Sequence, residues 1–169
     1  MVGEKAKSVN IDVMKIRIIQ VGKTKDKYIE EGLAELVKRL KAFAKLEIVT
    51  LKEVAASKAF TREHCKDFEG KQILQNLQKD EVVILLDEKG REMNSVEFAG
   101  FLEKYVDEGR EVVFVIGGPF GLSEEVKKKA NATIALSKMT FTHQMVRLFL
   151  LEQIYRGFCI INGKEYHHE

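Results

Sequence analysis

The chain has 169 residues, and its mix of 45% hydrophobic and 32% charged residues is ordinary for one globular domain. The 28 Lys and Arg residues outnumber the 26 Asp and Glu residues by only two, so any binding of RNA must rest on a local patch of charge. Apolar stretches end well before the ~18 residues of a membrane span, and the N-terminus lacks the apolar core of a signal peptide. These features predict a cytoplasmic protein without a membrane segment.

The first half of the chain alternates between strand and helix patterns. We expect strands at 15–22 and 45–51, and helices at 26–43 and 61–79. The apolar side of the second helix is expected to consist of Phe68, Ile73, Leu74 and Leu77.

The second half continues the alternation with two runs, "EVVILLD" (81–87) and "EVVFVIG" (111–117), that are typical of strands buried on both faces of a parallel sheet. A helix is expected at 94–108, a short strand at 132–137 and a long helix in the latter part of 138–158. Strands that alternate with helices predict an α/β fold, with a mainly parallel sheet flanked by helices.

The two cysteines, Cys65 and Cys159, lie far apart, and neither has a second thiol nearby in the sequence. This pattern predicts two reduced, buried thiols. Neither a disulfide nor a metal site built on cysteine is expected.

Ligands of parallel sheets bind beyond the carboxyl ends of the strands. Three loops are therefore candidates together: the one after Leu86, the one that starts at Gly117, and 137–142. Their convergence predicts one binding site at the edge of the sheet.

The stretch "VIGGPFGLS" (115–123) is a glycine-rich turn between an expected strand and an expected helix. It is neither a dinucleotide fingerprint, because Pro119 stands where a glycine must meet the pyrophosphate, nor a P-loop, because the Gly-Lys-Ser/Thr ending is missing. We expect Gly117 and Gly118 to allow close backbone approach and positive φ, which suits a neutral ligand edge. The alternative is a structural turn with Ser123 as a helix cap. A nucleotide-dependent oxidoreductase is disfavoured.

Three motifs carry a resemblance to a known family: "VIGGPFGLS", "LSKMTFTHQMVRLFLLEQIYR" and the terminal "YHHE". Together they resemble the RlmH family of small SPOUT methyltransferases, which methylate N3 of a pseudouridine in 23S ribosomal RNA. The resemblance runs from Met14 to Glu169 and is most specific over 113–169. It implies a single SPOUT domain at 14–169, preceded by an extension at 1–13 of unknown role.

The resemblance further implies a C-terminal trefoil knot, a homodimer and S-adenosylmethionine as the methyl donor. It implies a 23S rRNA substrate, and the low net charge favours recognition of that RNA in the assembled ribosome. The family's cofactor contacts correspond by position to Leu86, Gly117, Leu136, Ser137, Lys138, Met139, Thr140 and Phe141.

The family's tail ends in Tyr-His followed by a basic residue, which corresponds to Tyr166, His167 and then His168. The resemblance implies catalytic roles for Tyr166 and His167, and substrate contacts for His167 and His168. His168 departs from the family's basic residue, because histidine is mostly neutral near pH 7. A metal site at the adjacent histidines is not expected.

The last expected helix carries His143 and Arg147 in the family's "H-x-x-x-R" context. A catalytic role for His143 and a substrate contact for Arg147 are expected, with a core or capping histidine as the alternative for His143. Apolar residues spread around this helix favour a homodimer that it helps to form. Two other functions stay open: methylation of another RNA, such as tRNA, and RNA binding without catalysis.

Overall fold

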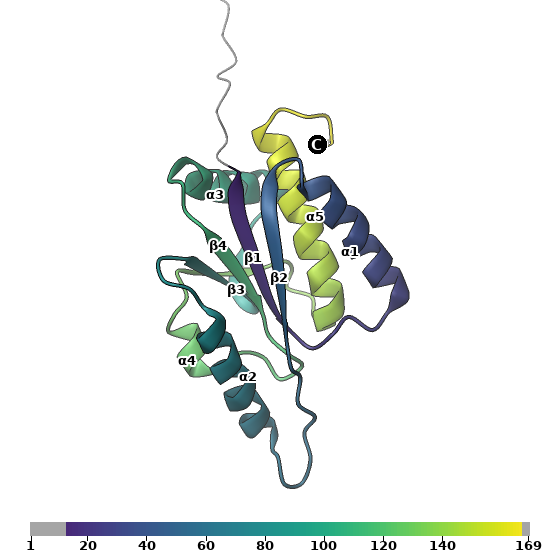
Figure 1. Ribbon diagram of the computed structural model, residues 1–169, viewed down its shortest axis with the longest axis vertical. Coiled ribbons are helices and arrows are strands. Elements are labelled where there is room, and N and C mark those ends of the chain that lie inside the picture. Colours follow the sequence, from purple (N-terminus) through teal and green to yellow (C-terminus); the bar gives the residue numbers. More distant parts are fainter. Residues whose placement is uncertain (1–12, 167–169) are drawn as a thin grey trace, which may run out of the picture.

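The computed structural model describes residues 13–166, and its centre is a five-stranded sheet with helices on both faces (Figure 1). The strands are β1 (Met14–Val21), β2 (Ala44–Leu51), β3 (Val82–Glu92), β4 (Val112–Ile116) and β5 (Ala132–Ala135). The helices are α1 (Lys27–Leu40), α2 (Arg62–Asn76), α3 (Ser95–Asp107), α4 (Glu124–Lys127) and α5 (His143–Ile161). The predicted α/β fold is confirmed.

The strand order is β2-β1-β4-β3-β5, and every pairing is parallel. The two apolar runs of the sequence become β3 and β4, which lie inside the sheet, and every residue of β4 is buried. Because the strands run in one direction, the sheet has two distinct ends. We call them the carboxyl edge, where the strands end, and the amino edge, where they begin.

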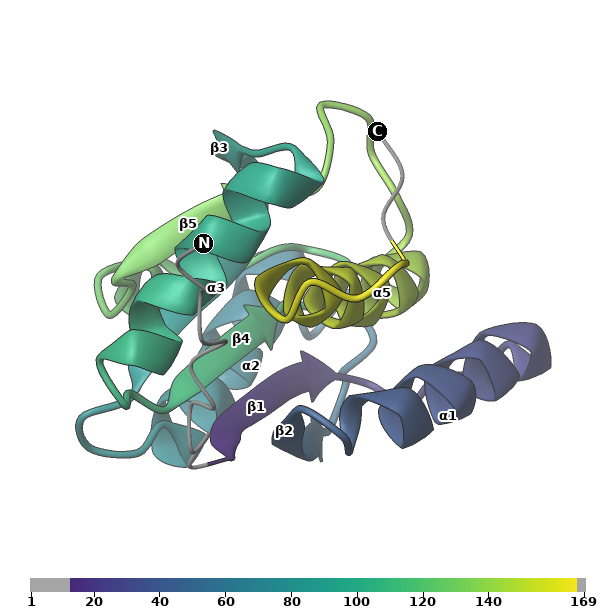
Figure 2. The ribbon, with the colours of Figure 1, turned by 90° about the horizontal axis from the view of Figure 1, so that it is seen from above.

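Two apolar cores lie on opposite faces of the sheet. On one face α1, α3 and α5 pack on the strands, with α5 between the other two helices (Figure 2). On the other face α2 and α4 pack together, with Ile73 and Val126 in the core. Leu150, Leu151 and Ile154 of α5 are fully buried within the single chain. These three apolar residues therefore need no second subunit to cover them.

The expected apolar side of α2 is wrong at Phe68, which is 39% exposed. The helix buries Ile73, as expected, together with Cys65, Glu69 and Gly70. Gly70 explains this orientation, because a Cβ there would lie 2.3 Å from the Ser123 hydroxyl oxygen. The missing side chain lets α2 come close to the glycine-rich turn. Both cysteines are buried and free, as predicted.

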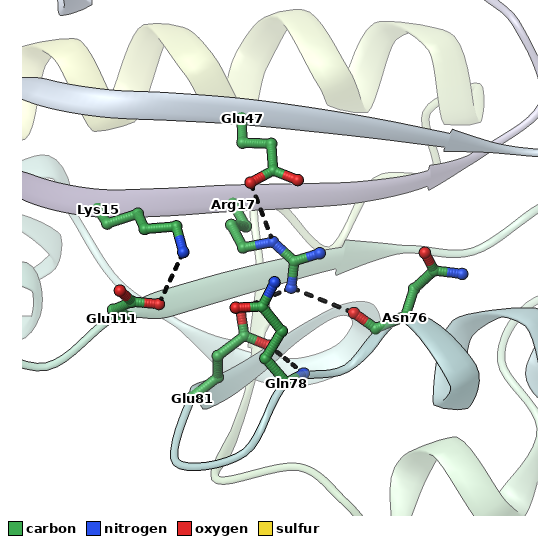
Figure 3. A network of polar contacts seen from close by, with 7 residues as sticks. All are labelled: Lys15, Arg17, Glu47, Asn76, Gln78, Glu81 and Glu111. Carbon is green, nitrogen blue, oxygen red and sulfur yellow. Dashed lines mark hydrogen bonds and ion pairs between the residues drawn. The ribbon is translucent and has the colours of Figure 1, made fainter.

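At the amino edge, a buried ion pair joins β1 to the start of β3 (Figure 3). Arg17 Nη1 lies 2.6 Å from Glu81 Oε1 and also donates to the Asn76 carbonyl at 3.2 Å. The other Glu81 oxygen accepts from the Gln78 backbone N–H at 2.7 Å. Arg17 Nε lies 3.5 Å from the Glu47 carboxylate. Both buried charges thus have an oppositely charged partner, although Arg17 Nε makes no hydrogen bond within the described residues.

None of the described helices is long and apolar enough to cross a membrane.

Candidate active site at the carboxyl edge of the sheet

Three of the predicted cofactor positions lie side by side across the sheet, at the level where β4 and β5 end. Leu86 of β3 is in register with Ile116 of β4 and with Ile134 of β5. Gly117 follows Ile116 directly, and Leu136 follows the end of β5. Residues that are far apart in the sequence are thus brought together at one edge, as the sheet argument predicted.

The glycine-rich turn is a tight reversal between Gly118 and Gly121, whose N–H donates to the Gly118 carbonyl at 3.1 Å. Pro119 occupies the second position, which suits its fixed φ. The expectation of positive φ at Gly117 and Gly118 is wrong, because the positive value falls on Gly121, at +84°. Close packing explains Gly117 instead. A Cβ there would lie 2.9 Å from Leu122 Cδ2, so a side chain would displace the turn itself.

The turn ends as expected, because the Ser123 hydroxyl accepts from the Val126 backbone N–H at 3.4 Å. The helix that follows, α4, has only four residues. The structural explanation of "VIGGPFGLS" as a capped strand-to-helix turn therefore holds, and it is compatible with a ligand at Gly117.

Strand β3 is longer than expected and contains a register shift. Leu86 and Arg91 both face Ile134, so residues 87–90 bulge out of the ladder. Gly90 permits this, because a Cβ there would lie 2.5 Å from the Ile134 carbonyl carbon. The bulge places the polar end of β3 beside the loop that follows β5.

The loop 136–141 contacts this bulge and shapes itself by local hydrogen bonds. Thr140 Oγ1 donates to Glu88 Oε2 at 3.3 Å, and the Met139 N–H donates to Ser137 Oγ at 3.0 Å. Lys138 is 87% exposed at its side chain, with its ammonium 3.7 Å from the Glu92 carboxylate. Met139 is 73% exposed, so this loop presents an apolar side chain on the surface.

A cavity of about 360 Å³ opens beside this loop, between the end of β5 and helices α3 and α5. Two predicted cofactor residues, Leu136 and Phe141, line it, and Phe98 and Phe149 add aromatic walls. Its lining also includes three polar residues, Asn94, Ser95 and Gln153. Apolar walls with a few polar groups suit a neutral heteroaromatic ring such as adenine. Leu86 and Gly117 lie at the strand ends and do not line this cavity.

Arg147, expected to contact the substrate, is 2% exposed and holds the loop between β1 and α1. Its Nη2 donates to the Val21 carbonyl at 2.6 Å, and its Nη1 donates to Thr24 Oγ1 at 2.9 Å. One turn earlier, Gln144 Oε1 accepts from the Lys25 backbone N–H at 2.8 Å. The structure therefore gives Arg147 an internal positioning role.

His143 is the first residue of α5, directly after the loop 136–141, and Thr142 caps the helix in its place. Its Nε2 is buried and has no hydrogen-bond partner within residues 13–166. Burial and then the charge of Arg147 lower the pKa of the imidazole, while Glu53 opposes this shift. His143 is thus held neutral at pH 7, the state in which an imidazole can accept a proton.

Glu69 lies beneath the glycine-rich turn, and sequence reasoning missed it. The residue is 1% exposed, and a Cβ on Gly118 would lie 2.6 Å from its Oε2. The Val54 backbone N–H is near, but neither carboxylate oxygen of Glu69 has a hydrogen-bond partner among the described residues. Burial raises the pKa of Glu69; the Val54 N–H opposes this and the charge of Glu53 adds to it. The helical spacing could have indicated that Glu69 is buried, because it lies midway between Cys65 and Ile73 on the same side of the helix.

Tyr166 lies at the opposite edge from these loops. Its ring packs against Tyr155 at 4.8 Å and under Arg156 at 4.7 Å, and its hydroxyl is 3.4 Å from Glu152 Oε1. Tyr155 in turn contacts Phe43, which precedes β2 at the amino edge. His167 and His168 lie outside the described residues. Within one chain, Tyr166 is thus not brought to the cofactor positions.

No group of three metal-ligating side chains occurs in the part of the chain that the structure describes. The terminal "HHE" lies outside that part, so the expectation of no metal there stays a prediction.

Comparisons with known proteins point to one family over nearly the whole chain. The model of the predicted SPOUT methyltransferase family matches residues 14–167. Relatives named "Ribosomal RNA large subunit methyltransferase H" occur in Geotalea uraniireducens, at 45% identity over 156 residues, and in Trichlorobacter lovleyi, at 47% over 156 residues. The relative of the same name in Porphyromonas gingivalis is 43% identical over 157 residues. Each alignment covers 92% of this chain and 100% of the relative.

A solved structure, a probable methyltransferase from Bordetella pertussis Tohama I, matches with a TM-score of 0.52 at 9% identity. The match covers 86% of this chain and 95% of that one, and it supports the fold alone. The family match and the full-length relatives carry the assignment. This chain belongs to the SPOUT methyltransferase family.

Proposed function

We propose that this protein transfers a methyl group from S-adenosylmethionine to N3 of a pseudouridine in 23S rRNA, acting on assembled ribosomes in the cytoplasm. One observation carries the proposal: Leu86, Gly117 and Leu136 lie on neighbouring strands at the carboxyl edge, where a parallel sheet places its ligand. Relatives at 43–47% identity over their full lengths are named as ribosomal RNA large subunit methyltransferases, which supports the choice of RNA.

The reaction is a single displacement. The N3 lone pair forms a bond to the methyl carbon as the carbon–sulfur bond breaks, so the positively charged sulfonium becomes a neutral thioether. N3 must also lose its proton, and a neutral group within hydrogen-bond reach lowers the barrier by accepting it. The protein's main task is to hold N3 in line with the methyl group and to exclude water.

The described residues fit the donor. The cavity lined by Leu136 and Phe141 offers apolar walls for adenine, and Gly117 lies on the neighbouring strand β4 at the same edge of the sheet. S-Adenosylmethionine supplies the activated methyl group when it is bound there. The family's knot around this region remains an expectation.

We assign the second half of the active site to a partner subunit. Helix α5 has 19 residues and so spans about 28 Å, and it separates His143 at the carboxyl edge from Tyr166 beyond the other end. A tail that acts on the substrate therefore cannot reach the cofactor loops of its own chain. A homodimer with two-fold symmetry would place each tail at the other chain's loops. The exposed Met139 and Phe141 give such an interface apolar area.

Mass spectrometry of nucleosides tests this function. Ribosomes that lack the modification are incubated with the protein and S-adenosylmethionine, and purified 23S rRNA and tRNA are incubated in parallel. The proposal requires a methyl group on N3 of one pseudouridine in ribosomal RNA, with little transfer to the purified RNAs. Methylation of tRNA alone would favour the other RNA substrate, and cofactor binding without any transfer would contradict catalysis.

A further inference from the structure

A second hollow lies at the carboxyl edge, on the β1–β2 side of the glycine-rich turn. It measures about 970 Å³ and is open to solvent. β1 pairs with β4, so the hollow begins next to the strand that leads into Gly117. Its cationic lining residues are Lys23, Lys25 and Lys52, and we call it the lysine hollow.

The three lysines have no carboxylate within 4.0 Å in the described part of the chain, whereas several other lysines do. The hollow also contains two carboxylates, Glu30 and Glu53. The negative charge of Glu53 interacts with the positive charge of the buried Arg147 of α5, which offsets it. The hollow therefore keeps a positive excess in a chain whose total net charge is only +2.

The segment that carries Lys23 and Lys25 is held in place from within. The buried Arg147 and Gln144 hold it by hydrogen bonds to Thr24 Oγ1 and to the Lys25 N–H. Both residues belong to the first turns of α5, which directly follows the cofactor loop 136–141. Lysines on a fixed backbone lose less freedom when they bind an anion.

A positively charged groove follows the sugar-phosphate backbone of single-stranded RNA, because each phosphate can bind a lysine. The lysine hollow, which is open to solvent, therefore fits a single-stranded segment of RNA.

We infer that the lysine hollow forms a binding site for a single-stranded segment of the substrate RNA, whose phosphates contact Lys23, Lys25 and Lys52. This inference rests on the proposed function, because it names the surface that holds the substrate beside the methyl donor. It also supplies the local patch that a chain of low net charge requires.

Equilibrium binding to RNA at several salt concentrations tests the site. The probes are a fluorescein-labelled single-stranded RNA of about 12 nucleotides and assembled 70S ribosomes. The variant Lys23→Ala/Lys25→Ala/Lys52→Ala is expected to bind at least about tenfold more weakly at low salt, and its salt slope should fall by about 2, at about 0.7 per lost phosphate contact. The matched control is Lys38→Ala/Lys41→Ala/Lys45→Ala, which removes three exposed lysines outside the hollow. The control should leave the salt slope unchanged.

Equal salt slopes for the two lysine triples would overturn the inference. A change of mass in light scattering for the variant Lys23→Ala/Lys25→Ala/Lys52→Ala, with RNA affinity intact, would instead make this surface a protein interface and overturn it too.

Calorimetry with S-adenosylmethionine separates this inference from the proposed function. All these variants should bind the cofactor like the unaltered protein. If the unaltered protein binds no cofactor and yet the lysine triple lowers the salt slope, the proposed function fails and the RNA site stands. If methyl transfer occurs and the triple behaves like its control, the function stands and the RNA site fails.

Discussion

The two edges of the sheet differ in how far their buried charges are compensated. At the amino edge Arg17 and Glu81 form a buried ion pair with further hydrogen bonds, and only Arg17 Nε lacks a hydrogen-bond partner among the described residues (Figure 3). At the carboxyl edge both carboxylate oxygens of Glu69 lack a hydrogen-bond partner in the described chain, and so do His143 Nε2 and Arg147 Nε. A buried polar atom without a partner costs free energy. We therefore expect the amino edge to contribute to stability and the carboxyl edge to carry the chemistry.

Removing the Arg17–Glu81 ion pair at the amino edge should give the largest loss of stability. Arg17→Ala leaves the Glu81 carboxylate buried without its cation and should lower the free energy of unfolding by about 3–5 kcal/mol. The control is Lys15→Ala, whose pair with Glu111 is exposed and should contribute no more than about 1 kcal/mol. Urea denaturation measures both variants. A loss below that of the control would refute the assignment of stability to the amino edge.

A substitution at the carboxyl edge should reduce cofactor binding more than stability. Gly90→Ala forces a Cβ against the Ile134 backbone and should cost about 1–3 kcal/mol of unfolding free energy while displacing β5 and the loop 136–141. Cofactor affinity, measured by calorimetry, should fall sharply. Gly100→Ala in α3 is the control, because nothing lies within 4 Å of its Cβ, and it should stabilise the fold by about 0.5–1 kcal/mol. Unchanged cofactor affinity in Gly90→Ala would separate β5 from the site.

The smallest effect should depend on pH. Because burial raises the pKa of Glu69, the folded state holds a proton that the unfolded state releases, and stability falls as the pH rises above about 4.5 towards the raised pKa. Glu69→Gln should remove this slope, at about 1.4 kcal/mol per unit of pKa shift. Urea denaturation between pH 4.5 and pH 8 measures it, with the exposed Glu103→Gln as control. Parallel pH profiles for Glu69→Gln and the unaltered protein would show that Glu69 does not titrate in this range.

Hydrophobic patterning was sufficient to predict the alternation of elements, and the convergence of the loops after Leu86, at Gly117 and at 137–142 followed from the parallel sheet. The pattern failed where tertiary contacts decide. Strand β3 extends through charged residues because Gly90 lets its backbone meet β5. Helix α2 turns Phe68 outward because Gly70 fits against Ser123.

The candidate site was predictable at its backbone positions and less so at its side chains. Arg147 has the sequence context of a substrate contact, but its burial against Val21 follows from packing that no single segment encodes. Likewise, the apolar residues around α5 indicated a dimer, yet α1 and α3 of the same chain cover most of them. The position of Tyr166 at the amino edge now gives the stronger argument for a second subunit.

The most direct test of the composite active site is methyl transfer by mixed dimers. One chain carries Gly117→Val, which displaces the turn at the cofactor positions, and the other lacks residues 167–169 and retains Tyr166, which packs on the core. Each variant alone should be inactive on ribosomes. Co-expressed, they should recover about a quarter of normal activity, because half of the dimers are mixed and each mixed dimer has one complete site. Full activity of the truncated chain, or no recovery in the mixture of stable dimers, would contradict a site that the partner's tail completes.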